Sequence, residues 1–164
     1  MMGIMTSLSS PITRRAFGGT TVAAGATLAL AACGDGSSAA PNNVPSAPPE
    51  PVGTGTVVAT TAELSVGTRL SVEAVHTQGE AAGRQAGFLL FRPNQKSVLA
   101  YSAICTHQGC AVGAMSPNDD EAFYCACHGS FFQPEDGKAV AGPARGALER
   151  FAAEIKGDDV LIYI

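Results

Sequence analysis

Two short segments, each with two cysteines and one histidine, constrain this 164-residue chain more than any other feature. Residues 105–110 read CTHQGC and residues 125–130 read CACHGS. Each segment follows an apolar run typical of a strand, so we expect both on loops at strand ends. Sulfur and imidazole donors gathered in this way are typical of a metal site or a set of disulfides.

Three arrangements of these residues are open from the spacing alone. The four cysteines could form two disulfides, with three possible pairings. A mixed Cys and His set could bind zinc. A mixed-ligand [2Fe–2S] cluster would instead take one Cys and one His from each segment. Neither a disulfide pair nor a zinc site explains why His107 and His128 occupy matching places, flanked by Gly109 and Gly129.

The paired motifs CTHxGC and CxCHGS resemble those of the Rieske iron–sulfur family. The resemblance implies one [2Fe–2S] cluster and a disulfide between the two remaining cysteines, Cys110 and Cys127. It also implies a loop over the cluster that contains Pro143, in the sequence Gly-Pro-Ala. The ligands implied by the resemblance are Cys105, His107, Cys125 and His128.

Three residues near the motifs bear on the tuning of such a cluster. Ser130 matches a serine whose hydroxyl donates to cluster or ligand sulfur in high-potential members of the family. Phe132 stands where those members have a tyrosine, so one donor is missing, and we expect an intermediate reduction potential. Gln108 replaces the apolar residue that is usual in quinol-oxidising members, which predicts a wetter tip.

The rest of the folded part has a β pattern and no long amphipathic helix. We predict an all-β fold, an antiparallel sandwich or barrel of the Rieske type, with a small cluster-binding subdomain formed by the two loops. His76 has no cysteine nearby and is expected at the surface. The predicted strands are 70–75, 122–125 and two hairpins: 88–92 with 97–101 around residues 93–96, and 147–155 with 160–164 around Gly157-Asp158.

Residues 1–32 are interpreted as a twin-arginine signal segment, with Arg14 and Arg15 before an uncharged run. This run is short and weakly apolar for a membrane span. It ends in Leu-Ala-Ala-Cys-Gly, which resembles a bacterial lipobox and predicts a lipid on Cys33. The alternative is an uncleaved transmembrane anchor.

Residues 33–55 are interpreted as a disordered linker rich in Pro, Ser and Ala, and residues 56–164 as the cluster domain. A chain cut before Cys33 keeps eight of the ten Lys and Arg residues and all fourteen acidic residues, a net charge of −6. A domain with this acidic charge is suited to a basic redox partner, such as many c-type cytochromes. The sequence contains no run of basic residues, so we do not expect nucleic acid as a partner.

These features predict a membrane-anchored one-electron carrier on the extracytoplasmic face, with redox proteins or a membrane quinol enzyme as partners. The alternatives are the Rieske subunit of a cytochrome bc1-type quinol–cytochrome c oxidoreductase, or the small subunit of an exported molybdenum oxidase of the arsenite type. In both, the chain would be catalytic only as a component of a complex. A Rieske oxygenase needs a further mononuclear iron site, yet no histidine follows His128. A soluble oxygenase ferredoxin typically lacks the two extra cysteines.

Overall fold

The computed structural model describes residues 43–47, 49–118 and 121–164, so the signal segment and Cys33 lie outside the described residues. Apart from a single 3-10 turn, η1 (Gly79–Ala81), the regular structure in this part of the chain is all β. The prediction of an all-β antiparallel fold is confirmed. The strands are β1 (Thr56–Thr60), β2 (Arg69–Val75), β3 (Gln85–Asn94), β4 (Ser97–Ser102), β5 (Phe123–Cys125), β6 (Ser130–Phe132), β7 (Ala139–Ala141), β8 (Arg150–Lys156) and β9 (Asp159–Tyr163).

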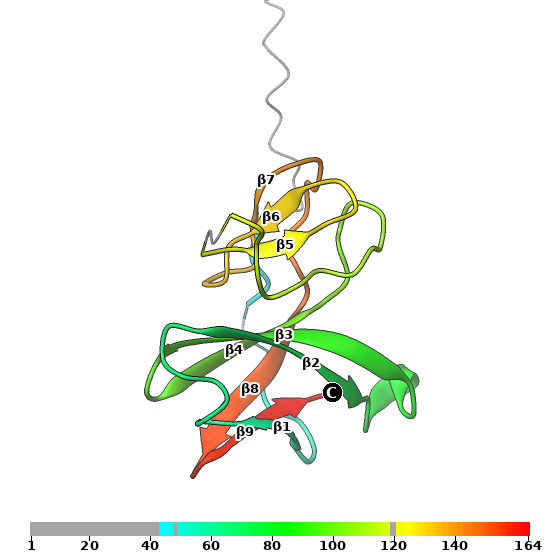
Figure 1. Ribbon diagram of the computed structural model, residues 1–164. Coiled ribbons are helices and arrows are strands. Elements are labelled where there is room, and N and C mark those ends of the chain that lie inside the picture. The colour runs from blue at the N-terminus through cyan, green and yellow to red at the C-terminus, as the bar shows by residue number, and fades with distance from the viewer. Residues whose placement is uncertain (1–42, 48, 119–120) are drawn as a thin grey trace, which may run out of the picture. The chain divides into compact units, whose positions relative to one another are not determined.

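Six strands form one antiparallel sheet in the order β1-β9-β8-β4-β3-β2, and its edge strands β1 and β2 approach each other (Figure 1). The apolar run in β3 is continuous because its alternate residues pack into two different cores, one on each face of the sheet. Phe88 and Leu90 belong to the core inside this large sheet. Leu89 and Phe91 belong to a second core on its other face.

Both predicted hairpins are present in the large sheet. β3 runs to Asn94, which pairs with Ser97, so the turn is shorter than the loop of four residues expected from the sequence. The backbone N–H of Lys96 donates to Asn94 Oδ1 at 2.9 Å and closes this turn. β8 and β9 pair around Gly157, whose φ of 63° lies in the left-handed region that favours glycine.

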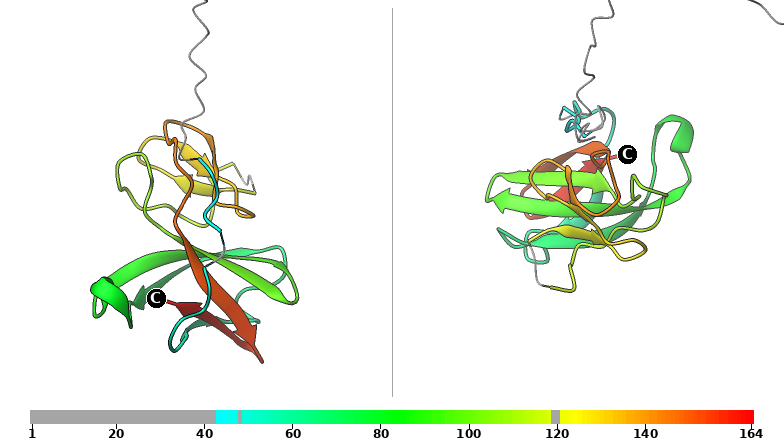
Figure 2. Two further views of the ribbon diagram at one scale, coloured as in Figure 1. Left: turned by 180° about the vertical axis from the view of Figure 1, so that it is seen from behind. Right: turned by 90° about the horizontal axis from the view of Figure 1, so that it is seen from above.

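The short strands β5, β6 and β7 form a separate sheet in that order. They are inserted between β4 and β8, which pair directly through Ala100 with Phe151 and Tyr101 with Arg150. Figure 2 (left) shows the chain passing from this insertion back into β8. The predicted small subdomain is therefore an insertion with its own three-stranded sheet in addition to the two loops.

The core associated with this insertion contains both of the cysteines predicted as ligands, Cys105 and Cys125. His76 lies elsewhere and is half-buried, which corrects its expected surface position. Its ring contacts Phe88 and Phe151 edge-on, at centroid distances of 5.5 and 6.2 Å. In the described part of the chain, no helix has the length and apolar character needed to cross a membrane.

Candidate metal centre

The two Cys and His segments fold into matching turns. In the first, the N–H of Gly109 donates to the carbonyl of Cys105 at 2.8 Å. In the second, the N–H of Gly129 donates to the carbonyl of Cys125 at 3.0 Å. Both glycines have positive φ values, 75° and 73°, which other residues adopt with strain. The two glycines that flank the histidines in the sequence thus close the turns that present them.

The sulfur atoms of Cys105 and Cys125 lie together inside the core. The two residues are only 3% and 1% exposed, and neither is in a disulfide. Burial raises the pKa of the Cys125 thiol, and a hydrogen bond with the Cys105 thiol raises it further. Two buried free thiols at one place are suited to a soft metal ion, whose charge compensates that of the thiolates.

The rings of His107 and His128 also meet, at a centroid distance of 4.8 Å and an interplanar angle of 87°. His107 is half-buried, whereas His128 is exposed. The Nδ1 atom of His107 is buried and has no hydrogen-bond partner among the described residues. A buried polar atom of this kind is costly without a partner, and a metal ligand role would supply one.

A disulfide joins the two turns, between Cys110 and Cys127, with their Cα atoms 6.5 Å apart. This prediction from the family resemblance is confirmed. The sulfur of Cys125 lies within 4.8 Å of both disulfide sulfurs. Because disulfide sulfurs are not thiolates, the residues of the two motifs that could hold a cluster are Cys105, Cys125 and the two histidines.

The loop that contains Pro143 packs on the second motif. Ser130 is fully buried, and its Oγ accepts a hydrogen bond from the N–H of Ala144 at 3.1 Å. Gly142 approaches so closely that an added Cβ would lie 2.6 Å from Ser130 Cα. The hydroxyl of Ser130 therefore fixes this loop through its oxygen, and its hydrogen remains available to a further acceptor.

The other two residues expected to tune the site lie in opposite environments. Phe132 is fully buried in the same core as Cys105 and Cys125. Cys125 pairs with Ser130 and Phe123 with Phe132, so alternation puts Phe132 on the same face of the small sheet as Cys125. Gln108 is exposed, and the wetter tip expected from it stays a prediction.

One contact of the first motif was not predicted from the sequence. The hydroxyl of Thr106 donates to the carbonyl of Gly146 at 2.7 Å and ties the first turn to the segment between β7 and β8. The sequence feature that could have indicated this contact is the threonine between the cysteine and the histidine of the CTH triplet. Its partner lies 40 residues away, and the sequence pattern did not indicate it.

Comparison with known proteins decides the family. A model of the Rieske [2Fe-2S] domain family matches residues 54–152, which is more than half of the chain. The chain belongs to the Rieske [2Fe-2S] domain family. It therefore carries one [2Fe–2S] cluster, and its chemistry is Rieske-type electron transfer.

Individual relatives match shorter segments. The chain is 35% identical over 66 residues to the cytochrome b6-f complex iron-sulfur subunit of Chlorobaculum thiosulfatiphilum, which covers 40% of the chain and 35% of the relative. It is 33% identical over 69 residues to the cytochrome bc1 complex Rieske iron-sulfur subunit of Streptomyces lividans, 42% and 40% of the two chains. The matched segments thus span little more than a third of these curated relatives.

Among solved structures, the chain is similar to the plasma membrane Rieske protein of Synechocystis PCC 6803. The two share 28% sequence identity, with a TM-score of 0.48. The match covers 65% of this chain and 97% of that chain.

Proposed function

We propose that Cys105 and Cys125 bind one iron of the cluster and that His107 and His128 bind the other. The observation that supports this assignment is the pairing of like donors, thiol with thiol and ring with ring, by two matching turns. A [2Fe–2S] cluster with this mixed ligation supplies one-electron chemistry at a higher potential than an all-cysteine cluster.

Each group of side chains at the site has a separate role in such a carrier. The two buried cysteines exclude water from one side, and His128 is exposed where a partner protein can approach. The disulfide between Cys110 and Cys127 holds the two turns at a fixed separation.

We also propose that the protein is a free-standing one-electron carrier on the extracytoplasmic face of a bacterial membrane. Arg14 and Arg15 support export by the twin-arginine route, and the lipobox-like sequence supports a lipid on Cys33. Residues 33–55 then form the tether and residues 56–164 the redox domain. The acidic charge of the domain favours a basic electron acceptor.

EPR of the dithionite-reduced full chain tests the ligand set. We expect a rhombic signal of the Rieske type, lost in the Cys105→Ser and His128→Ala variants. His76→Gln is the matched control, because the His76 ring packs on Phe88 and Phe151 of the large sheet, and the variant should leave the signal unchanged. A full signal in either ligand variant would refute the assignment. Fractionation and mass spectrometry of the mature N-terminus test the lipid on Cys33.

The second candidate function is that of the Rieske subunit in a cytochrome bc1-type complex. The similarity to iron-sulfur subunits named for the b6-f and bc1 complexes favours it. The exposed Gln108 and the buried Phe132 favour the free-standing carrier, because they depart from the quinol-oxidising pattern. Co-purification from solubilised membranes separates the two: a stoichiometric cytochrome b would establish the subunit, and the domain alone would establish the carrier.

A further inference from the structure

The chain before β1 lies along the folded domain and reaches the small sheet. Near β1, the carbonyl of Val52 accepts a hydrogen bond from Gln78 Nε2 at 2.7 Å. Farther toward the N-terminus, Asn43 contacts Ala139 in β7. The described residues of this segment, 43–47 and 49–55, therefore contact both the connection after β2, at Gln78, and the sheet that carries the second Cys and His motif.

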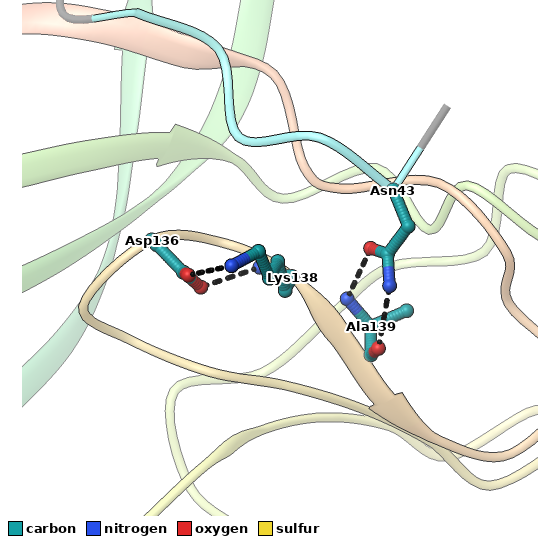
Figure 3. Close-up of polar contacts among 4 residues, drawn as sticks. All are labelled: Asn43, Asp136, Lys138 and Ala139. Carbon is teal, nitrogen blue, oxygen red and sulfur yellow. Dashed lines mark hydrogen bonds and ion pairs between the residues drawn. The ribbon is translucent and has the colours of Figure 1, made fainter. Parts of the chain in front are cut away.

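The contact of Asn43 with Ala139 uses both polar atoms of the amide side chain (Figure 3). Asn43 Nδ2 donates to the carbonyl of Ala139, and Asn43 Oδ1 accepts from the N–H of Ala139, each at 3.0 Å. Among the strands of the described residues, β7 lies at the edge of the small sheet, so its outward backbone groups have none of these strands beside them. One side chain thus satisfies the pair of groups that a neighbouring strand would have satisfied.

The turn that leads into β7 is itself fixed. The backbone N–H of Lys138 donates to Asp136 Oδ1 at 3.0 Å, and Lys138 Nζ lies 2.9 Å from Asp136 Oδ2 (Figure 3). After Ala139 the chain continues directly into Gly142, which packs on Ser130 of the second motif. Asn43 is therefore docked at the end of the domain that bears the cluster motifs.

We propose that Asn43 is a positioning residue that docks the tether on β7, so that the chain leaves the domain at its cluster end. The consequence for reach rests on the proposed function, namely on a lipid at Cys33. Ten residues from Cys33 to Asn43 span at most about 36 Å, whereas 23 residues from Cys33 to Thr56 would span about 80 Å. The docked tether holds the cluster end close to the bilayer, and its release roughly doubles the reach.

Hydrogen exchange on the full chain tests the docking itself. Asn43→Ala should accelerate exchange of the Ala139 amide by about tenfold, because two hydrogen bonds are lost. Asn43→Asp keeps the acceptor and loses the donor, so it should show less acceleration. Ser46→Ala is the control, because Ser46 is exposed in the same segment. Equal exchange at Ala139 in wild type and Asn43→Ala would overturn the docking.

EPR power saturation tests the consequence for reach. The lipidated full chain would be placed in phosphatidylcholine vesicles that contain a lipid with a nickel-chelating headgroup. We expect nickel to enhance the relaxation of the reduced cluster, and the enhancement to fall in Asn43→Ala. Equal enhancement in the two proteins would refute the positioning role.

The Rieske EPR signal, taken together with the exchange and relaxation measurements, distinguishes a failure of the proposed function from a failure of the role proposed for Asn43. An absent Rieske signal would refute the ligand set and leave the exchange result at Ala139 interpretable. A normal signal with unchanged exchange and unchanged relaxation would refute the role of Asn43 alone.

Discussion

Replacement of Gly142 by alanine measures how tightly the proline-containing loop is held on the second motif. Gly142 has a φ of 81°, in the left-handed region. An added Cβ would meet backbone atoms rather than movable side chains: the Gly129 carbonyl, and Ser130 Cα at 2.6 Å. The loop can accept the extra carbon only by moving away from the motif.

The expected cost has two parts. The left-handed backbone costs an alanine about 1 kcal/mol relative to glycine. Displacement of packed backbone by an added carbon costs about 2 kcal/mol more, as in an overpacked core. Gly142→Ala should therefore lower the free energy of unfolding by about 3 kcal/mol. The loop would also move off Ser130, whose Oγ accepts from the Ala144 N–H, and the cluster would become more accessible to water.

Gly157 provides the matched control. Its φ of 63° imposes the same kind of backbone strain, but nothing lies within 4 Å of an added Cβ. Gly157→Ala should cost only about 1 kcal/mol. Thermal unfolding separates the two variants, since 1 kcal/mol corresponds to roughly 4–8 °C in Tm for a domain near this size. Equal Tm values for the variants would refute the reasoning that Gly142 is needed for a close approach.

Three further predictions follow from the site and its core. Phe132→Tyr adds a donor to the core that contains the two thiols, and a redox titration should show the potential raised by roughly 60 mV, the equivalent of about 1.4 kcal/mol; an unchanged potential would contradict it. The Cys110→Ser, Cys127→Ser double variant removes a disulfide between residues 17 positions apart, and denaturant unfolding should show a free energy of unfolding lower by about 3 kcal/mol. A decrease well under about 1 kcal/mol would mean that packing alone holds the two turns together. Burial raises the pKa of Tyr101 to about 12, so the folded state keeps the proton more tightly than the unfolded state, and stability should fall as the pH rises from about 10 to about 12. Tyr101→Phe should abolish that loss, and because the Tyr101 hydroxyl has no partner among the described residues, unfolding at neutral pH should show a gain of about 1 kcal/mol; a lower stability would show that the hydroxyl is satisfied.

Five of the six strands of the large sheet could be read from local pattern, because alternation and apolar runs are properties of neighbouring residues; β1 was not among the predicted strands. The hairpin of β3 and β4 and that of β8 and β9 appear where the sequence predicts them. The pairing of β4 with β8 was not predicted, since the paired residues Tyr101 and Arg150 lie 49 positions apart and nothing local specifies the partner. The shorter turn at Gln95 and Lys96 depends on the side chain of Asn94, a detail finer than periodicity can indicate.

The sequence by itself determined the chemistry: two matching sets of sulfur and imidazole donors, each closed by a glycine, on an all-β chain. Donor identity and spacing are local, so the motifs alone indicated the family and its cluster. The family resemblance implied the pairing of Cys110 with Cys127, and the structure confirmed it. Only the tertiary structure placed Phe132 in the core that holds the two free thiols, on the same face of the small sheet as Cys125. Only it brought Asn43 to Ala139, 96 residues away. Such contacts depend on register and packing between distant segments, which no local pattern specifies.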